Sequence, residues 1–264
     1  MNESELPPAL LDEIGPVQGL TGSPQGMTST LAIAETASGR VAIKRAEGAL
    51  YSGWLAREHA VLSALAATTL PMPRPLAFVR DDTGLVPVAW LAMSCLPGRP
   101  LAEAPAVEQS QDRRVKVLRA YGRTLRDIHS AAAPAAIVRH SHGWLDYMLE
   151  EASENLEHFN VDGTPQLLAS LRQARPSPVM ETLIHGDFTI DNVLTDGDAI
   201  TGVIDWSGGA VGDPRYDLAL AIRPHHGFFE KQRAQDLHAF FDGYGGDLLS
   251  QADFEYFNGL YEFF

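Results

Sequence analysis

Residues 183–194 read LIHGDFTIDNVL, and the interpretation of the whole chain starts from this stretch. An apolar run is interrupted by the triplet that ends at Asp187, and Asn192 follows five residues later. A second apolar run, VIDW, contains another carboxylate at Asp205. Polar groups beside buried strands are costly unless they are paired or bind a ligand. The pattern therefore indicates that these side chains serve a functional site.

The spacing D-x-x-x-x-N repeats that of a kinase catalytic loop, where the aspartate accepts a proton from the substrate hydroxyl and the asparagine holds magnesium. Asp205 lies eighteen residues after Asp187, and the segment between them reads as strand, turn and strand. Such a hairpin brings the oxygens of Asn192 and Asp205 to one end, and oxygen ligands suit Mg²⁺. The alternative, turn and cap residues, accounts for residues 196–198 but not for the three polar groups beside apolar runs.

Residues 27–46 read as a β-hairpin that carries a lysine, Lys44, near its end. The stretches TSTLAIAET and RVAIKRA alternate in polarity around the turn ASG. Glu58 follows fourteen residues after Lys44, within a helical pattern over residues 51–67. An ion pair between the two would hold the ammonium toward phosphate oxygens, as in kinases. A solvated edge lysine is the alternative.

The order of elements predicts an α+β fold in two lobes. The first third is rich in strands, whereas the remainder is mostly helical and encloses one small hairpin. Proline-rich LPMPRP ends the first helix, and strong helical patterns recur over residues 112–130 and 144–159. We expect a β-rich N-lobe over residues 1–93, a hinge over 94–98 and a C-lobe over 99–264.

The composition is that of an ordinary globular protein, with 45% hydrophobic and 20% charged residues among 264. Cys95 is the single cysteine, which excludes an internal disulfide and a cysteine-based zinc site. The start of the chain is acidic, and the apolar stretch over residues 85–98 is short and broken by proline. We therefore expect a cytoplasmic protein without a targeting peptide or membrane span, as a monomer or weak homodimer.

The net charge of −14 is concentrated in the second half of the chain. Residues 1–139 carry 14 Lys and Arg against 13 Asp and Glu, whereas residues 140–264 carry 6 against 21. Such a field repels nucleic-acid phosphates, so a nucleic-acid partner is not expected. It attracts cations, including amine-bearing small molecules. A contribution to solubility alone is the alternative.

Taken together, HGDFTIDNVL, VIDWSGGAVGDPRYDLALA, VAIK and AMSCLPGRPL resemble the aminoglycoside phosphotransferase family of small-molecule kinases. The superfamily also contains choline, homoserine, fructosamine and methylthioribose kinases. The resemblance runs from about residue 15 to the end of the chain. It implies a protein-kinase-like fold with ATP in the cleft under the hinge and Mg²⁺ as cofactor. It also implies roles for five residues: Lys44 on the phosphates, Glu58 as its partner, Asp187 as catalytic base, and Asn192 and Asp205 as metal ligands.

Other matches to the family are weaker. The resemblance places Met93 and Cys95 of the hinge, and Ser23 of the Gly-rich stretch GLTGSPQG, among the nucleotide-binding residues. That stretch is neither G-x-G-x-x-G nor a Walker A sequence, so turn glycines are an equal alternative. In GDPRYDLA, Asp213 is expected to cap a helix and Asp217 to brace the catalytic loop, although Asp217 also remains a candidate for substrate binding. No Ala-Pro-Glu segment follows, which argues against a protein kinase.

We expect an ATP- and Mg²⁺-dependent O-phosphotransferase that acts on a small, cationic molecule such as an aminoglycoside, with antibiotic resistance as its role. The acidic stretch WLDYMLEEASENLEHF suits such an acceptor through Glu151 and Glu154, although a solvated helix face is the alternative. The terminal Phe264 is a candidate for closing the acceptor pocket.

Two other functions remain open. One is a metabolite kinase of the same fold for a choline-like, sugar or amino-alcohol acceptor. The other is a catalytically silent nucleotide-binding module, against which the complete set of kinase residues argues. The pair His225 and His226 lacks a third metal ligand at fitting spacing, so we interpret it as part of a surface loop.

Overall fold

The computed structural model of the protein describes residues 1–23, 28–104, 110–246 and 249–264, which form two compact units. Unit 1 comprises Met1–Pro97 and Gly202–Gly208, and unit 2 comprises Gly98–Thr201 and Gly209–Phe264. The expected lobes, 1–93 and 99–264 around a hinge, differ from these units at one important place. Gly202–Gly208, which carries Asp205, belongs to unit 1, because its turn η3 (Trp206–Gly208) packs against helix α2 (Ala49–Leu65) of that unit.

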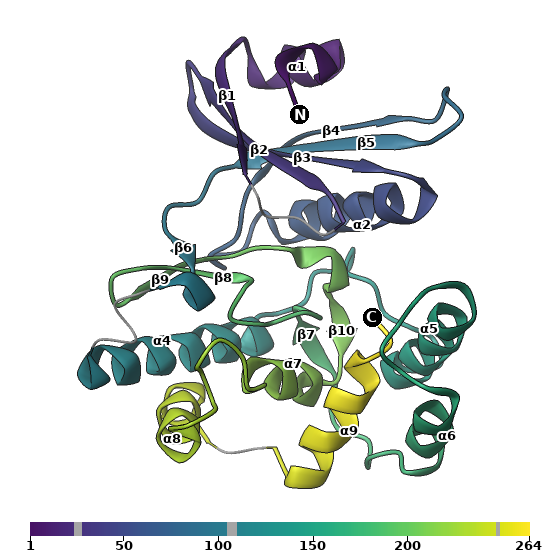
Figure 1. Cartoon of the computed structure of the whole chain (residues 1–264), viewed down its shortest axis with the longest axis vertical. Coiled ribbons are helices and arrows are strands. Elements are labelled where there is room, and N and C mark those ends of the chain that lie inside the picture. Colours follow the sequence, from purple (N-terminus) through teal and green to yellow (C-terminus); the bar gives the residue numbers. More distant parts are fainter. Residues whose placement is uncertain (24–27, 105–109, 247–248) are drawn as a thin grey trace. The chain divides into compact units, whose positions relative to one another are not determined.

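Unit 1 is built on a five-stranded antiparallel sheet in the order β1-β2-β3-β5-β4 (Figure 1). The predicted hairpin is formed by strands β2 and β3, which turn at Gly39, where φ is 115°. A residue with a side chain would be strained at that angle, so glycine fits the turn. The strands are β1 (Val17–Ser23), β2 (Thr30–Thr36), β3 (Gly39–Glu47), β4 (Pro75–Asp81) and β5 (Val88–Ser94).

Helices α1 (Pro8–Ile14) and α2 cover opposite faces of this sheet (Figure 1). Successive side chains of a strand point to alternate faces. Ile43 of β3 is therefore buried in one apolar core with Leu10 of α1. Lys44, the next residue, lies on the face covered by α2, where it meets Glu58. The polarity pattern of β3 thus delivers one charged group into the interior of unit 1.

Unit 2 contains a close pair of helices, α4 (Gln111–Ser130) and α8 (Arg233–Tyr244). A Cβ atom added at Gly122 of α4 would lie 2.0 Å from the main-chain oxygen of Phe240, so only glycine permits this approach. A buried ion pair also joins the helices, with Arg114 donating to both oxygens of Asp236 at 2.7 and 2.6 Å. The helix predicted over residues 112–130 corresponds closely to α4.

An apolar core of unit 2 lies among four helices and includes Trp144, Phe257 and Phe263. These helices are α5 (Trp144–His158), α6 (Pro165–Gln173), α7 (Pro214–Ala221) and α9 (Gln251–Tyr261). Asp213 caps α7 as predicted, because its side chain accepts a hydrogen bond from the main-chain nitrogen of Arg215 at 3.0 Å.

Short strands and turns complete the described chain. Strand β7 (Thr182–Ile184) pairs with β10 (Ala210–Gly212), and a three-stranded sheet has the order β6-β8-β9. The remaining bounds are β6 (Arg99–Pro100), β8 (Val193–Asp196), β9 (Ala199–Val203), η1 (Glu3–Glu5) and η2 (Leu101–Glu103). The predicted hairpin around residues 196–198 is thus formed by β8 and β9.

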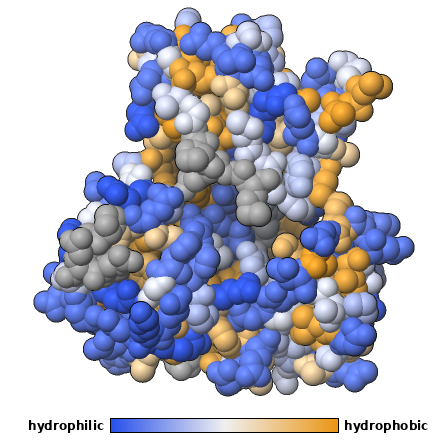
Figure 2. Space-filling view, in the orientation of Figure 1, coloured by the Kyte–Doolittle hydropathy of each residue, from blue (hydrophilic) through white to orange (hydrophobic). Residues whose placement is uncertain are grey.

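The surface is of mixed polarity. On the face drawn in Figure 2, hydrophilic residues predominate and hydrophobic ones gather in separate small groups. Among the residues that the structure describes, no helix combines the length and apolar character needed to cross a membrane.

Candidate active site

Lys44 is the centre of a charged cluster in unit 1. Its ammonium donates to both carboxylate oxygens of Glu58, at 2.8 and 2.9 Å, and it also pairs with Asp205. Lys44 is 9% exposed and Glu58 is 3% exposed. Burial acts to lower the pKa of Lys44, but the two carboxylates outweigh it and the pKa is raised. Lys44 is therefore a fixed positive charge in the interior.

Asp205 occupies an unusual backbone conformation, with φ at 64° in the left-handed region. Its neighbours hold it there. The main-chain nitrogen of Val203 donates to Pro71 at 2.6 Å, and the buried indole of Trp206 donates to the oxygen of Val203 at 2.9 Å. Strained residues persist only where the surroundings fix them. The Asp205 side chain is 44% exposed, so a carboxylate paired with Lys44 also faces solvent.

An open polar pocket surrounds this cluster. It is lined by Lys44, Glu58 and Asp205 together with Thr28, Ser29, Ala46, Tyr51, Trp54, Leu55 and Ser207. Ser23 of the Gly-rich stretch is predicted from the sequence, whereas Thr28 and Ser29 are not. The available signal for these two is the hydroxyl run TST, which begins two residues after that stretch ends. Ser23 ends β1, and its side chain and residues 24–27 lie outside the described part of the chain.

The two hinge candidates differ in their surroundings. Met93 is buried in β5, where it pairs with Ala42 and Pro75. The main-chain nitrogen of Cys95 donates to the oxygen of Arg40 at 3.3 Å. Neither residue lines the pocket around Lys44, so their contact with a nucleotide stays a prediction.

Asp187 lies in unit 2, in the loop after β7, and each of its carboxylate oxygens accepts a hydrogen bond. The amide nitrogen of Asn192 donates to Oδ2 at 2.7 Å and also to the main-chain oxygen of Asp187 at 2.9 Å. The phenol of Tyr261 donates to Oδ1 at 3.0 Å. Asn192 uses its nitrogen in these bonds, whereas a metal ion would bind its oxygen.

Tyr261 is a site residue that sequence reasoning missed. It comes from the end of α9, and its ring packs under the guanidinium of Arg223 at 5.1 Å. Burial and the nearby charge of Asp187 raise the pKa of Tyr261, so the phenol remains a donor. The sequence pointed to the chain end only through Phe264. No local pattern could reveal a contact across 74 residues.

Asp217 braces the loop that carries Asp187 through hydrogen bonds with main-chain nitrogens. It is fully buried and accepts hydrogen bonds from the main-chain nitrogens of His185 at 2.7 Å and Gly186 at 2.8 Å. It also meets the imidazole of His129 at 3.2 Å. His185 in turn accepts from the main-chain nitrogen of Asp187 at 3.2 Å. Asp217 was also a candidate for substrate binding, and the structure corrects this, because a carboxylate with 0% exposure cannot contact an acceptor.

The residues predicted to bind the acceptor lie on α5 and at the end of the chain. Glu151 is half-buried and Glu154 is exposed on α5, whereas Asp146 of the same helix pairs with Arg175 at 2.6 Å. Phe264 is 46% exposed, but the preceding Phe263 is fully buried in the core of unit 2. Truncation of the last four residues would therefore damage the core as well as any acceptor contact.

The chain is similar to known proteins over most of its length. The model of a family described as the phosphotransferase enzyme family matches residues 23–255. An aminoglycoside 3'-phosphotransferase of Streptomyces fradiae is 29% identical over 215 residues, which are 74% of each chain. A homoserine kinase of Methylobacterium sp. is 27% identical over 218 residues, 80% of this chain and 65% of that protein.

Solved structures give a similar answer for the fold. The aminoglycoside phosphotransferase APH(3'')-Id from Streptomyces rimosus, in complex with ADP and streptomycin, matches with a TM-score of 0.71. The match covers 97% of this chain and 96% of that chain at 20% sequence identity. The predicted two-lobed kinase-like fold is thereby confirmed.

Proposed function

The chain belongs to the phosphotransferase enzyme family and is a small-molecule kinase with a hydroxyl acceptor, and from this premise we propose that it uses ATP and Mg²⁺ to phosphorylate a small cationic molecule of the aminoglycoside type. The observation that carries the proposal is the cluster of Lys44 with Glu58 and Asp205. Three charged residues, far apart in the chain, meet in unit 1 as phosphate and metal binding in a kinase requires.

In the proposed reaction, Lys44 binds phosphate oxygens while Glu58 keeps its ammonium extended. Asp205 would hold magnesium through its carboxylate, and Asn192 would offer its amide oxygen to magnesium. The donor set fits, because a carboxylate and an amide oxygen are the hard ligands that Mg²⁺ takes alongside water and phosphates. When bound, magnesium neutralises the charge that develops on the transferred phosphoryl group.

Asp187 orients the acceptor hydroxyl and takes its proton. The hydroxyl oxygen forms a bond to the γ-phosphorus, the bond from that phosphorus to the bridging oxygen of ADP breaks, and the proton passes to the carboxylate of Asp187. Asn192 and Tyr261 fix the plane of this carboxylate through Oδ2 and Oδ1. Both donors are neutral, and together they fix the orientation of the carboxylate.

The charge of the chain supports a cationic acceptor. Residues 140–264 carry 21 Asp and Glu against 6 Lys and Arg. On α5, Glu150, Glu154 and Glu157 are exposed, and Asp146 is the one acid of that helix with an ion pair among the described residues. Exposed carboxylates of this density raise the local concentration of polyamines such as aminoglycosides. The similarity to homoserine kinase keeps a metabolite acceptor as the second candidate.

A screen of acceptors tests the proposal. The purified protein is incubated with Mg-ATP and with aminoglycosides, macrolides, choline or homoserine, and ADP release is measured with and without magnesium. We expect magnesium-dependent turnover with the highest kcat/KM for an aminoglycoside. Turnover of choline or homoserine alone would replace the acceptor class. Stabilisation by Mg-ATP without turnover of any acceptor would contradict the proposed reaction.

The variant Asp187→Ala tests the assignment of the base. Turnover should fall by about 10²–10⁴-fold, the usual contribution of a general base. The thermal stabilisation by Mg-ATP should persist, because Lys44 and Glu58 are untouched. Asp196→Asn is the matched control, since Asp196 is an exposed aspartate that ends β8. If Asp187→Ala turned over as fast as the wild type, another group would have to be the base.

A further inference from the structure

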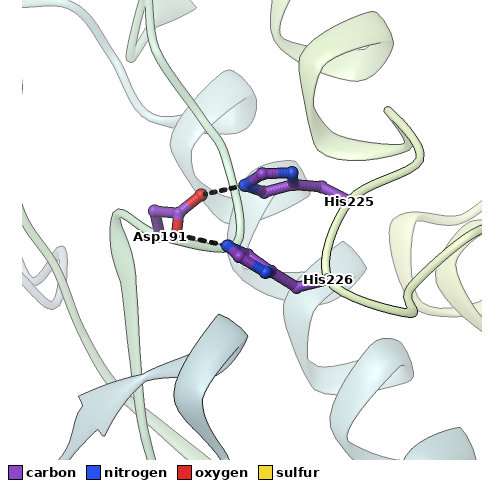
Figure 3. Close-up of side chains that lie close together, drawn as sticks. All are labelled: Asp191, His225 and His226. Carbon is purple, nitrogen blue, oxygen red and sulfur yellow. Dashed lines mark ion pairs between the residues drawn. The ribbon is translucent and has the colours of Figure 1, made fainter.

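His225 and His226 meet a third potential ligand in the folded chain. Asp191, 34 residues before His225, lies in the catalytic loop beside Asn192. Its Oδ2 atom is 3.4 Å from Nε2 of His225, and its Oδ1 atom is 4.0 Å from Nε2 of His226 (Figure 3). One ligand atom from each of the three residues lies within 4.8 Å of the others. The interpretation of the histidines as an ordinary surface loop therefore overlooked a ligand that spacing could not reveal.

The turn that carries the histidines is firmly anchored. His225 and Phe228 exchange two main-chain hydrogen bonds, at 3.1 and 2.8 Å. Phe228 and Phe229 are buried, and the main-chain nitrogen of Phe229 donates to the buried Asp236 at 2.8 Å. The imidazoles project from this anchored turn toward Asp191 (Figure 3). Their positions follow from the fold of unit 2.

We propose that Asp191, His225 and His226 form a binding site for a divalent transition-metal ion of the Zn²⁺ class. Imidazole nitrogens select zinc, copper and nickel over magnesium, and two imidazoles with one carboxylate form a common ligand set that leaves further positions for water. Ligand atoms on a tetrahedral zinc ion lie roughly 3.3 Å apart, given its bond lengths. The 3.4 and 4.0 Å distances run to the two different oxygens of Asp191, and rotation of the exposed side chains would bring the three ligand atoms, now within 4.8 Å of one another, to this spacing.

The exposure of the cluster permits that rotation. The side chains of Asp191, His225 and His226 are 48%, 51% and 55% exposed, so an ion and its waters have access. The two imidazole rings lie with centroids 3.9 Å apart. Rings this close can direct a nitrogen each to one cation, which the carboxylate of Asp191 also reaches.

The proposed zinc site differs from the proposed magnesium ligands in the type of its ligand atoms and in the effect of an ion bound there. A bound ion would link the catalytic loop, through Asp191, to the turn after α7. Binding to the folded state alone stabilises that state by mass action. Occupancy should therefore raise the melting temperature, with magnesium unable to replace zinc.

Zinc titration of the full chain tests the inference. The protein is stripped of metal with a chelator, and ZnCl₂ is added with magnesium in excess, followed by calorimetry and thermal unfolding. We expect saturable one-to-one binding and a rise in melting temperature. The variants His226→Asn and Asp191→Asn should each weaken zinc binding by at least about tenfold. Loss of a residue that only supports a ligand already costs about this much affinity, and loss of a ligand should cost no less.

The double variant His225→Asn/His226→Asn should lose both effects while it keeps the melting temperature of the metal-free wild type. His238→Asn is the control, because His238 is exposed on α8 and lies outside the cluster. Absence of saturable zinc binding in the wild type would overturn the inference. Equal zinc affinity in the double variant and the wild type would overturn it as well, since the ion would then bind elsewhere.

Discussion

The two units hold the carboxylates of the candidate site by different groups. In unit 1, Glu58 and Asp205 are held by the ammonium of Lys44. In unit 2, Asp187 is held by the neutral groups of Asn192 and Tyr261. An ion pair holds charge in the interior, whereas an amide and a phenol fix the orientation of a carboxylate. Unit 1 thus holds a buried positive charge between two carboxylates, and unit 2 orients the carboxylate of Asp187 by hydrogen bonds.

The difference predicts the largest effect on stability at Lys44. In Lys44→Met, Glu58 keeps its burial but loses its lysine, and breaking a buried ion pair typically costs about 3–5 kcal/mol. We expect a loss of this size in the free energy of unfolding, measured by urea denaturation. The pKa of Lys44 is raised above its ordinary value of 10.5, so its contribution is present at neutral pH and is lost only as pH rises above that value.

The double variant Lys44→Met/Glu58→Leu sharpens this test. This double variant removes both charges of the buried ion pair, so most of the free energy of unfolding that Lys44→Met loses should return. Turnover should be absent in the single and the double variant. Recovery of turnover together with stability would contradict a direct role of Lys44 on the phosphates. A single variant as stable as the wild type would contradict the buried ion pair.

A smaller effect is expected at Asp217, where backbone donors replace the lysine. Asparagine at this position offers one acceptor oxygen, and its amide would face the nitrogens of His185 or Gly186. Asp217→Asn should cost about 1–3 kcal/mol and lower kcat, with the KM for ATP unchanged, because the loop that carries Asp187 shifts.

The matched control for Asp217 is Asp213→Asn, on the same helix. Asp213 caps α7 and pairs with Arg215 at 2.6 Å. Its replacement should reduce stability without reducing kcat. If both variants lowered kcat equally, Asp217 would act only through the stability of α7.

The smallest effect is expected at Tyr261, where a single neutral hydrogen bond is removed. Tyr261→Phe should lower kcat by roughly fivefold, the rate equivalent of about 1 kcal/mol, with little change in the KM for the acceptor. Steady-state kinetics measures both. Tyr256→Phe on α9 is the control, because Tyr256 donates to the oxygen of Leu171 at 3.1 Å and should leave kcat unaltered. An unchanged kcat in Tyr261→Phe would remove Tyr261 from the site.

Periodic patterns of polar and apolar residues were enough to predict individual helices and strands. The alternation over residues 27–46 predicted β2 and β3, and the helical period over residues 112–130 predicted α4. Each pattern is written in adjacent residues, so it survives without knowledge of the partners. The kinase-like spacing of Asp187 and Asn192 is equally local, and the roles that it indicates for them stay a prediction.

The remaining features depend on contacts between distant segments. The assignment of Asp205 to unit 1 follows from packing of η3 on α2, and the lobe boundaries expected from the sequence could not include it. Tyr261 reaches Asp187 only because α9 folds back within unit 2. The meeting of Asp191 with His225 and His226 has the same origin. Spacing along the chain contains no information on such contacts.

The central proposal is that Asp205, beside Lys44 in unit 1, binds the magnesium ion of Mg-ATP. The concentration of magnesium that gives half-maximal turnover tests it most directly, measured for the wild type, Asp205→Asn and the control Asp196→Asn. We expect Asp205→Asn to raise that concentration by at least about tenfold, the usual cost of weakening a metal site, whereas Asp196→Asn should leave it unchanged. An unchanged magnesium requirement in Asp205→Asn would contradict the account.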